Sequence, residues 1–385
     1  MLQIVSFGVA ALYSAMWCLR WARGGGLESA GVQLGLFSGM VCVGSVAGVV
    51  AWAAFMQRHA FLYDAHVRAG VIPQQGYTLY ASSFRFLAVF DMLNGVEFLC
   101  LIICKLMLLG RLATNATQSS QTELTDMSGV RRRWLSARAL PIVYRVTAGA
   151  VVVGSVVGMV ADAVSGTYDV QSALLSDQAA AACDAAGNDT NSSRALYNDN
   201  NAIRYKARTA ASVQAGSEAL TLLLVSVAFL VIVSWSVALF RMLERVAARA
   251  LLSNSDGWNM KASEANAARI VADTMQAAAE QRWRLTAACV VVLITFPVRA
   301  AFDLLHAYAT FNDAFNLACG ECDSCQLTPI LINSWLHYTP EFRSIAVALS
   351  SPLPLVLSLW LLTSVHARVR LIAADVERAR VSDGV

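Results

Sequence analysis

Three ionisable side chains lie at helical spacing inside an apolar stretch in the last third of the chain. In "FPVRAAFDLLHAYA", Arg299, Asp303 and His306 follow one another at intervals of four and three residues. These intervals place the three side chains on one face of a helix. An ionisable group at the centre of a membrane helix costs roughly 2.5 to 3.5 kcal/mol, so each group needs a partner or a polar cavity.

A second apolar stretch, "RFLAVFDMLNGVEFLCLIICKLMLLG", carries Asp91, Asn94 and Glu97. Each step of three residues turns the helix face by about 60 degrees, so these side chains form one continuous polar stripe. When both stretches are counted from their outer ends, Asp91 and Arg299 lie at similar depth. Asp91 and Arg299 could therefore pair.

Three further carboxyl groups, from Asp162, Glu218 and Glu341, lie near the outer ends of other apolar stretches. Convergent polar groups in an apolar setting predict a ligand pocket in the outer half of the protein. The alternative is that Arg299 only neutralises Asp91 or Asp303 and locks helices together. The sequence leaves both interpretations open.

The composition indicates that these stretches lie in a membrane. Hydrophobic residues make up 57% of the 385 residues, charged residues 14%, and the mean hydropathy is +0.53. The hydrophobic and charged fractions both lie outside the usual range of globular proteins. Windows of about 19 residues identify seven apolar stretches long enough to cross a hydrocarbon core of about 30 Å. We predict an all-α integral membrane protein, a seven-transmembrane helix bundle with spans at about 4–20, 31–55, 84–110, 141–165, 217–241, 285–308 and 342–365.

Basic residues indicate the orientation of this bundle. With the N-terminus outside and the C-terminus in the cytoplasm, most of the 29 Lys and Arg residues lie in inner segments, as the positive-inside rule requires. The predicted organisation is a membrane domain over 1–370 with an extracellular or lumenal loop at 166–216, a cytoplasmic loop at 242–284 and a cytoplasmic tail at 371–385.

The outer loops carry sites for covalent modification. "NDTNSS" contains glycosylation acceptors at Asn188 and Asn191, whereas a third acceptor, Asn115, falls in an inner loop and should stay unmodified. Four cysteines also fall in the outer loops, and an even number on an oxidising face predicts two disulfides of open connectivity. The competing interpretation of "CGECDSC" is a metal site. The cysteines concerned are Cys183, Cys319, Cys322 and Cys325.

Other features concern packing and movement. Residues 258–284 are rich in helix-forming side chains, so we expect an inward extension of the sixth span that could bind a cytoplasmic signalling or trafficking partner. "GSVVG", from Gly154 to Gly158, predicts close helix packing. Prolines should kink or loosen the last two spans and act as hinges. The predicted hinges are Pro297, Pro352 and Pro354.

Several functional classes lack their motifs. The chain contains no H-E-x-x-H, G-x-S-x-G or P-loop sequence, and no filter motif of a channel. We therefore expect neither an enzyme nor a cofactor, metal or nucleic-acid partner. Two classes remain: a receptor or receptor-like scaffold for an extracellular or lumenal ligand, and a secondary transporter that uses the intramembrane charges for ion or proton coupling.

Two resemblances favour the receptor class. Seven spans with the N-terminus outside resemble the topology of G-protein-coupled receptors. "FPVRAAFD", followed by "TPEF" and "PLPLVLSLWLL", resembles the layout of the tobamovirus-multiplication (THH) type seven-pass proteins and their animal orphan-receptor relatives. That resemblance covers the last third of the chain and carries over Arg299 and Glu341. It implies a receptor-like protein that acts in trafficking or as a scaffold, in the plasma membrane or an endomembrane.

Overall fold

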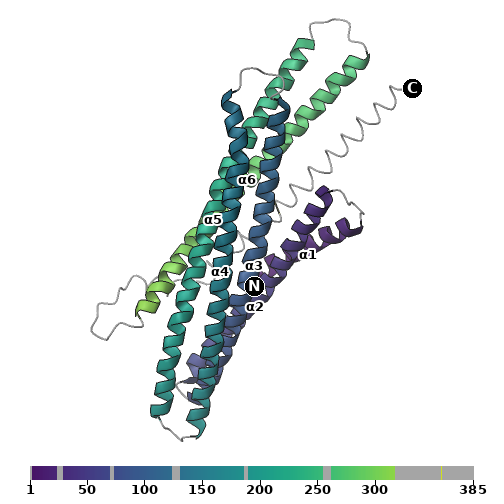
Figure 1. The fold of residues 1–385 in the computed structure, drawn as a ribbon. Helices are drawn as coiled ribbons and strands as arrows, with labels where there is room; N and C mark the ends of the chain where they lie inside the picture. Colours follow the sequence, from purple (N-terminus) through teal and green to yellow (C-terminus); the bar gives the residue numbers. More distant parts are fainter. Residues whose placement is uncertain are drawn as a thin grey trace. The chain divides into compact units, whose positions relative to one another are not determined.

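The computed structural model of the protein describes residues 2–23, 29–69, 73–123, 131–185, 190–254 and 262–316, and also Leu357. Each of the six ranges is one helix. Figure 1 shows these helices in chain order. They are α1 (Leu2–Arg23), α2 (Ser29–Ala69), α3 (Pro73–Glu123), α4 (Arg131–Ala185), α5 (Thr190–Asn254) and α6 (Ala262–Asn316).

Five of the helices are long and apolar enough to cross a membrane. A helix satisfies its own backbone hydrogen bonds, which is the requirement for a lipid-exposed chain. The apolar part of α1, Gln3–Leu19, is shorter. The prediction of an all-α membrane protein is therefore confirmed at the level of helix content and apolar length. The seventh predicted span, 342–365, lies outside the described helices. The five candidate spans are Gly35–Arg68, Gln75–Thr114, Leu140–Cys183, Asp199–Trp235 and Val290–Asn312.

The helices extend beyond the apolar stretches that identify them. Most of the predicted loop 166–216 is helical, because α4 continues to Ala185 and α5 begins at Thr190. The sequence there is rich in alanine, the strongest helix former. With 55 residues, α4 is about 80 Å long, well beyond a hydrocarbon core of about 30 Å. Likewise α6 is continuous from Ala262, so the segment expected to precede the sixth span is helical, and Pro297 lies inside this helix.

The chain divides into two compact units. Unit 1 contains Met1–Cys104, Gly149–Leu224 and Thr295–Leu353, and unit 2 contains Lys105–Ala148, Val225–Ile294 and Pro354–Val385. In unit 2, Gly110 lets α3 approach Tyr144 of α4, since a Cβ atom at Gly110 would lie 2.6 Å from the tyrosine hydroxyl oxygen. Buried Leu109, Phe229 and Ile232 contribute to its apolar interior.

Small residues allow close helix packing in unit 1. The helix α1 packs against α2 (Figure 1), where Phe7 occupies the space above Gly48. The predicted "GSVVG" packing face contacts α5: a Cβ atom at Gly154 would lie 2.6 Å from the hydroxyl oxygen of Thr221, and one at Gly158 would lie 2.7 Å from that of Ser217. These glycines thus permit the approach of α4 and α5 that small residues allow in membrane helices.

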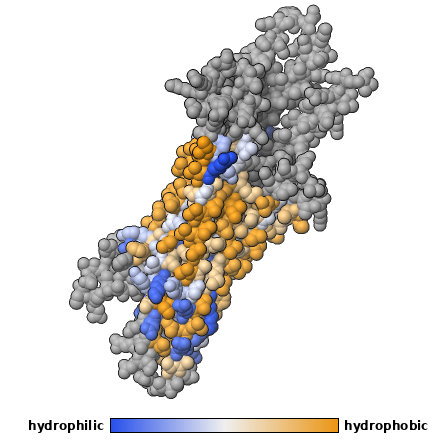
Figure 2. Space-filling view, in the orientation of Figure 1, coloured by the Kyte–Doolittle hydropathy of each residue, from blue (hydrophilic) through white to orange (hydrophobic). Residues whose placement is uncertain are grey.

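The surface of the helices matches a lipid environment. Valines such as Val153, Val160 and Val227 are exposed on α4 and α5. Figure 2 shows hydrophobic residues over most of the described face, with hydrophilic residues gathered at the end of unit 1 where α4 ends and α5 begins. Since apolar side chains face outward on these helices, a charged side chain buried between them has largely apolar surroundings.

The modification sites and distal hinges fall mainly outside the described helices. Cys183 lies near the end of α4 and joins no disulfide among the described cysteines. Its predicted partners Cys319, Cys322 and Cys325 are outside the described residues, as are Asn188, Pro352 and Pro354. Asn191 lies in the first turn of α5. The disulfides, the glycans and the distal hinges therefore stay predictions.

Candidate functional site

Five helices line one cavity in unit 1. The cavity has a volume of about 360 Å³ and receives side chains from α2, α3, α4, α5 and α6. This volume is at the lower end of the range of small-molecule sites. Its walls carry both signs of charge: five acidic residues, Asp91, Asp162, Asp169, Glu218 and Asp303, and four arginines, Arg58, Arg204, Arg208 and Arg299.

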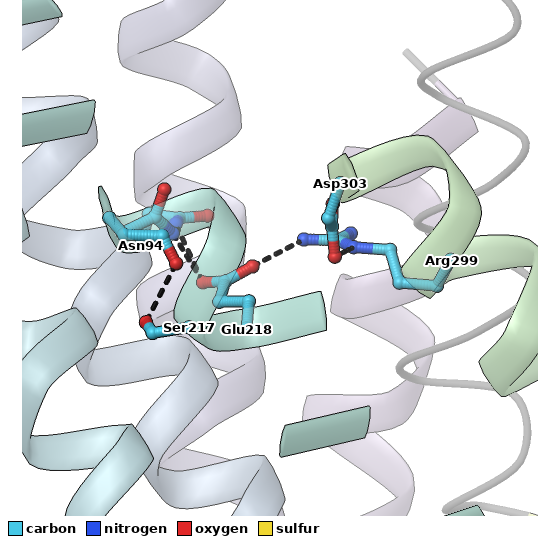
Figure 3. A network of polar contacts seen from close by, with 6 residues as sticks. Asn94, Ser217, Glu218, Arg299 and Asp303 are labelled. Atoms are coloured by element: carbon cyan, nitrogen blue, oxygen red, sulfur yellow. Dashed lines mark hydrogen bonds and ion pairs between the residues drawn. The ribbon is translucent and has the colours of Figure 1, made fainter. Parts of the chain in front are cut away.

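Arg299 of α6 is the centre of a buried ion-pair network (Figure 3). Its Nε donates to Asp303 Oδ2 at 2.9 Å, one turn along α6, and its Nη2 donates to Glu218 Oε2 of α5 at 3.2 Å. The side chains of Arg299, Glu218 and Asp303 are 12%, 3% and 6% exposed. Charged side chains this deeply buried are stable only when they form ion pairs and hydrogen bonds, which offset the cost of removing them from water.

Two amide side chains hold the other oxygen of Glu218. Gln214 Nε2 donates to Glu218 Oε1 at 2.5 Å from the preceding turn of α5, and Asn94 Nδ2 of α3 donates to the same oxygen at 3.5 Å. Because one carboxylate oxygen binds arginine and the other binds amides, the plane of the Glu218 carboxylate is fixed. The network thus joins α3, α5 and α6 (Figure 3).

Asp162 lies on the α4 wall of the cavity and is 5% exposed. Gly95 makes room for it on α3, since a Cβ atom at Gly95 would lie 2.9 Å from Asp162 Oδ2. Its charged neighbours, Glu218 and Asp91, are both acidic. Within the described ranges, no basic side chain forms an ion pair with Asp162.

The part of the cavity around Asp169 is richer in arginine. Asp169 is 3% exposed and follows Asp162 by two helical turns; its charged neighbours are Asp91, Arg58 and Arg204. Arg58 lies over the ring of Phe55 at 5.8 Å, and Arg204 over the ring of Phe84 at 5.6 Å. Aromatic faces attract cations in this arrangement.

Aromatic side chains cover another part of the cavity wall. Trp52 meets the rings of Phe55 and Phe90 edge-on at centroid distances of 5.3 and 5.6 Å. Phe302 and His306 of α6 stack at 6.4 Å, and both line the cavity. The site therefore combines an aromatic wall with more polar groups than a typical small-molecule site carries.

The structure brings most of the predicted polar residues together. Asp91, Asn94, Asp162, Arg299, Asp303 and His306 all line the cavity. Glu97 is buried at 4% exposure but lies outside the lining, and its Oε2 faces Gly48 of α2. Glu341 lies outside the described residues.

Of the two partners that the sequence offers for Arg299, the structure pairs it with Asp303 and not with Asp91. Its second partner is Glu218. The reason is geometric: Glu218 faces α6 from α5, whereas the charged neighbours of Asp91 include Arg58 and Asp169. Equal depth of two residues in their predicted spans therefore does not determine whether their side chains pair.

Several lining residues were absent from the predicted site. Asp169, Arg204 and Arg208 fall in the predicted outer loop 166–216, which is helical at these positions. The seven-residue interval from Asp162 to Asp169 and the four-residue interval from Arg204 to Arg208 are both typical of one helix face. These intervals are the sequence signal that indicates a shared helix face for each pair of residues.

Fold and site together define a helical membrane protein with a charged cavity among its helices. No family model, curated protein or solved structure matches the chain. Among the described residues, no group of His, Cys, Asp and Glu side chains has an arrangement that could hold a metal ion.

Proposed function

We propose that the protein is a receptor-like multi-pass membrane protein that binds a small polar ligand in the cavity of unit 1. The observation that carries this proposal is the convergence of ionisable side chains from five helices on one cavity of about 360 Å³. An ionisable residue inside a membrane bundle is by default a functional-site candidate because its burial is costly.

A helix lock alone accounts for only part of this arrangement. A lock needs Arg299, Glu218 and Asp303, which satisfy one another. It requires neither an open volume beside them nor the buried carboxyl groups of Asp162 and Asp169 on the α4 wall. The cavity and these carboxyl groups therefore favour ligand binding in addition to helix locking.

The proposed topology is the one that the sequence predicts. Seven spans with the N-terminus outside, in the plasma membrane or an endomembrane, let the ligand enter from the extracellular or lumenal side. Binding shifts α6 at Pro297, and the inner segment 242–284 receives the cytoplasmic partner. The distribution of Lys and Arg supports this orientation.

A cavity-filling variant tests ligand binding directly. The protein in nanodiscs is screened against small polar compounds, with the thermal midpoint of unfolding as the readout. Ala211 lines the cavity, so Ala211→Phe should abolish stabilisation by any true ligand. The matched control is Ala163→Phe, an exposed position on α4. Equal stabilisation of Ala211→Phe and the wild type would contradict binding in this cavity.

A secondary transporter is the second candidate. It is favoured by the carboxyl groups that four helices, α3 to α6, bring to the same cavity, since chains of carboxyl groups relay protons in pumps and transporters. Proteoliposomes separate the two candidates. A transporter moves a compound found in the screen across the bilayer and produces a current with it, whereas a receptor binds the compound without flux.

A further inference from the structure

Negative charge exceeds positive charge around Arg299. Three buried carboxyl groups, from Asp162, Glu218 and Asp303, share this part of the cavity with one arginine. Arg299 uses Nε for Asp303 and Nη2 for Glu218. Asp162, which is 5% exposed and lines the cavity, has Asn94 as a hydrogen-bond partner, but its charged neighbours are all acidic.

A buried carboxylate without a cation is strongly destabilising, so it must be neutralised by a proton or by a positively charged ligand. A directly coordinated metal ion is not favoured, because the described His, Cys, Asp and Glu side chains form no suitable group. The open volume beside Asp162 leaves room for an organic cation.

The arginine itself provides a second, independent indication of a ligand. Nη1 of Arg299 is buried and has no hydrogen-bond acceptor in the described structure. Arg299 lines the same cavity as Asp162. A buried donor left unsatisfied destabilises the protein, and more strongly when the group is charged. The site therefore lacks one cation and one hydrogen-bond acceptor.

We propose that the cavity binds an organic cation whose primary ammonium group lies at Asp162 and whose oxygen atom accepts a hydrogen bond from the Arg299 guanidinium, which turns its buried Nη1 toward the ligand. This inference rests on the proposed ligand-binding function and specifies its ligand class. A neutral acceptor oxygen, such as a hydroxyl or amide oxygen, fits better than a carboxylate, because a carboxylate would add to the excess of negative charge. Phe90 and Phe302 line the same cavity and offer apolar surface to the carbon chain of such a ligand.

Three compounds of equal chain length test this ligand class. 5-Aminopentan-1-ol carries the ammonium and the oxygen, pentane-1,5-diol lacks the ammonium, and pentylamine lacks the oxygen. A flexible chain of five carbons allows the two groups to adjust to the site. Dissociation constants are measured with the full-length protein in nanodiscs, by thermal shift and by isothermal calorimetry.

We expect 5-aminopentan-1-ol to bind at least tenfold more tightly than the diol and at least threefold more tightly than pentylamine. Asp162→Asn should weaken its binding at least tenfold. Asp177→Asn, the same change on the same helix at an exposed ion pair outside the cavity, should leave binding unchanged. If Asp162→Asn fails to fold, the comparison of compounds on the wild type still decides the question.

Equal affinity for the amino alcohol and the diol would overturn the inference, and so would unchanged affinity in Asp162→Asn. Either result would mean that a proton neutralises Asp162. The cavity proposal fails separately, when no compound of the wider screen distinguishes the wild type from Ala211→Phe. A compound without an ammonium group that binds the wild type but not Ala211→Phe would keep the proposed function and reject the organic cation.

Discussion

Arg299 of α6 and Glu218 of α5 form an ion pair of 3.2 Å in which the side chains are only 12% and 3% exposed. These two residues are separated by 81 positions in the chain. The pair connects two helices, and Asp303 of α6 occupies a second arginine nitrogen. Arg299 is therefore accommodated by one carboxylate of its own helix and one of a neighbouring helix.

Removal of the arginine should destabilise unit 1 strongly. Arg299→Met leaves Glu218 and Asp303 buried without their cation. Loss of one partner of a buried pair costs about 3–5 kcal/mol. We expect a decrease of that size in the free energy of unfolding, measured by titration with a denaturing detergent.

A double-mutant cycle shows how much of this loss belongs to the pair. Arg299→Met combined with Glu218→Leu removes both charges, so the double variant should be more stable than Arg299→Met alone. Strictly additive losses would contradict an energetic coupling between Arg299 and Glu218.

The contact between α4 and α5 should be sensitive to side-chain size. Gly154→Leu forces a side chain toward Thr221, whose hydroxyl oxygen would lie 2.6 Å from the new Cβ atom. Overpacking of this kind costs about 1–3 kcal/mol. Gly149→Leu on the same helix is the control, because no atom lies within 4 Å of its Cβ position. Similar unfolding curves for both variants would show that this contact is not tight.

An exposed ion pair between α3 and α4 should behave differently from the buried pair between α5 and α6. Arg85 Nη2 of α3 and Asp177 Oδ2 of α4 lie 2.5 Å apart, and the two side chains are 56% and 35% exposed. Exposed pairs contribute about 0.2–1 kcal/mol. Asp177→Asn should therefore lower the free energy of unfolding by less than about 1 kcal/mol, and the loss should shrink further at high salt. A loss as large as that of Arg299→Met would refute this view.

Glycosylation tests the predicted orientation. In a eukaryotic host, Asn188→Gln and Asn191→Gln should each increase electrophoretic mobility by removing a glycan, because both acceptors lie in a predicted outer segment. Asn115→Gln should not alter mobility, since its acceptor sequence is predicted to face the cytoplasm. The opposite pattern, with a glycan at Asn115 only, would reverse the orientation.

The positions of the helices could be predicted from hydropathy, but their lengths could not. The stretches 31–55, 84–110, 141–165, 217–241 and 285–308 lie inside α2 to α6. A hydropathy window responds to apolar side chains alone. It therefore misses the polar, alanine-rich ends of α4 and α5, where helix propensity and packing continue the helix.

Most of the polar residues of the site could be predicted from the sequence, but only one of the two ion pairs of Arg299 could. The contact between Arg299 and Asp303 follows from their spacing on one helix. The contact with Glu218 depends on how α5 and α6 are rotated toward each other, which hydropathy and depth do not determine. The interval from Asp162 to Asp169 likewise places both carboxyl groups on one face only if the residues between them are helical, which hydropathy does not show for 166–216.

The spacing of these two carboxyl groups restricts how α4 can change in length. Seven residues correspond to almost two complete turns, so Asp162 and Asp169 line the same wall. One inserted residue between them would rotate everything beyond it by about 100 degrees. That rotation would turn Asp169 out of the cavity and bring a neighbouring side chain into its place. The segment from Asp162 to Asp169 should thus tolerate substitutions at its lipid-facing positions far better than any single insertion or deletion.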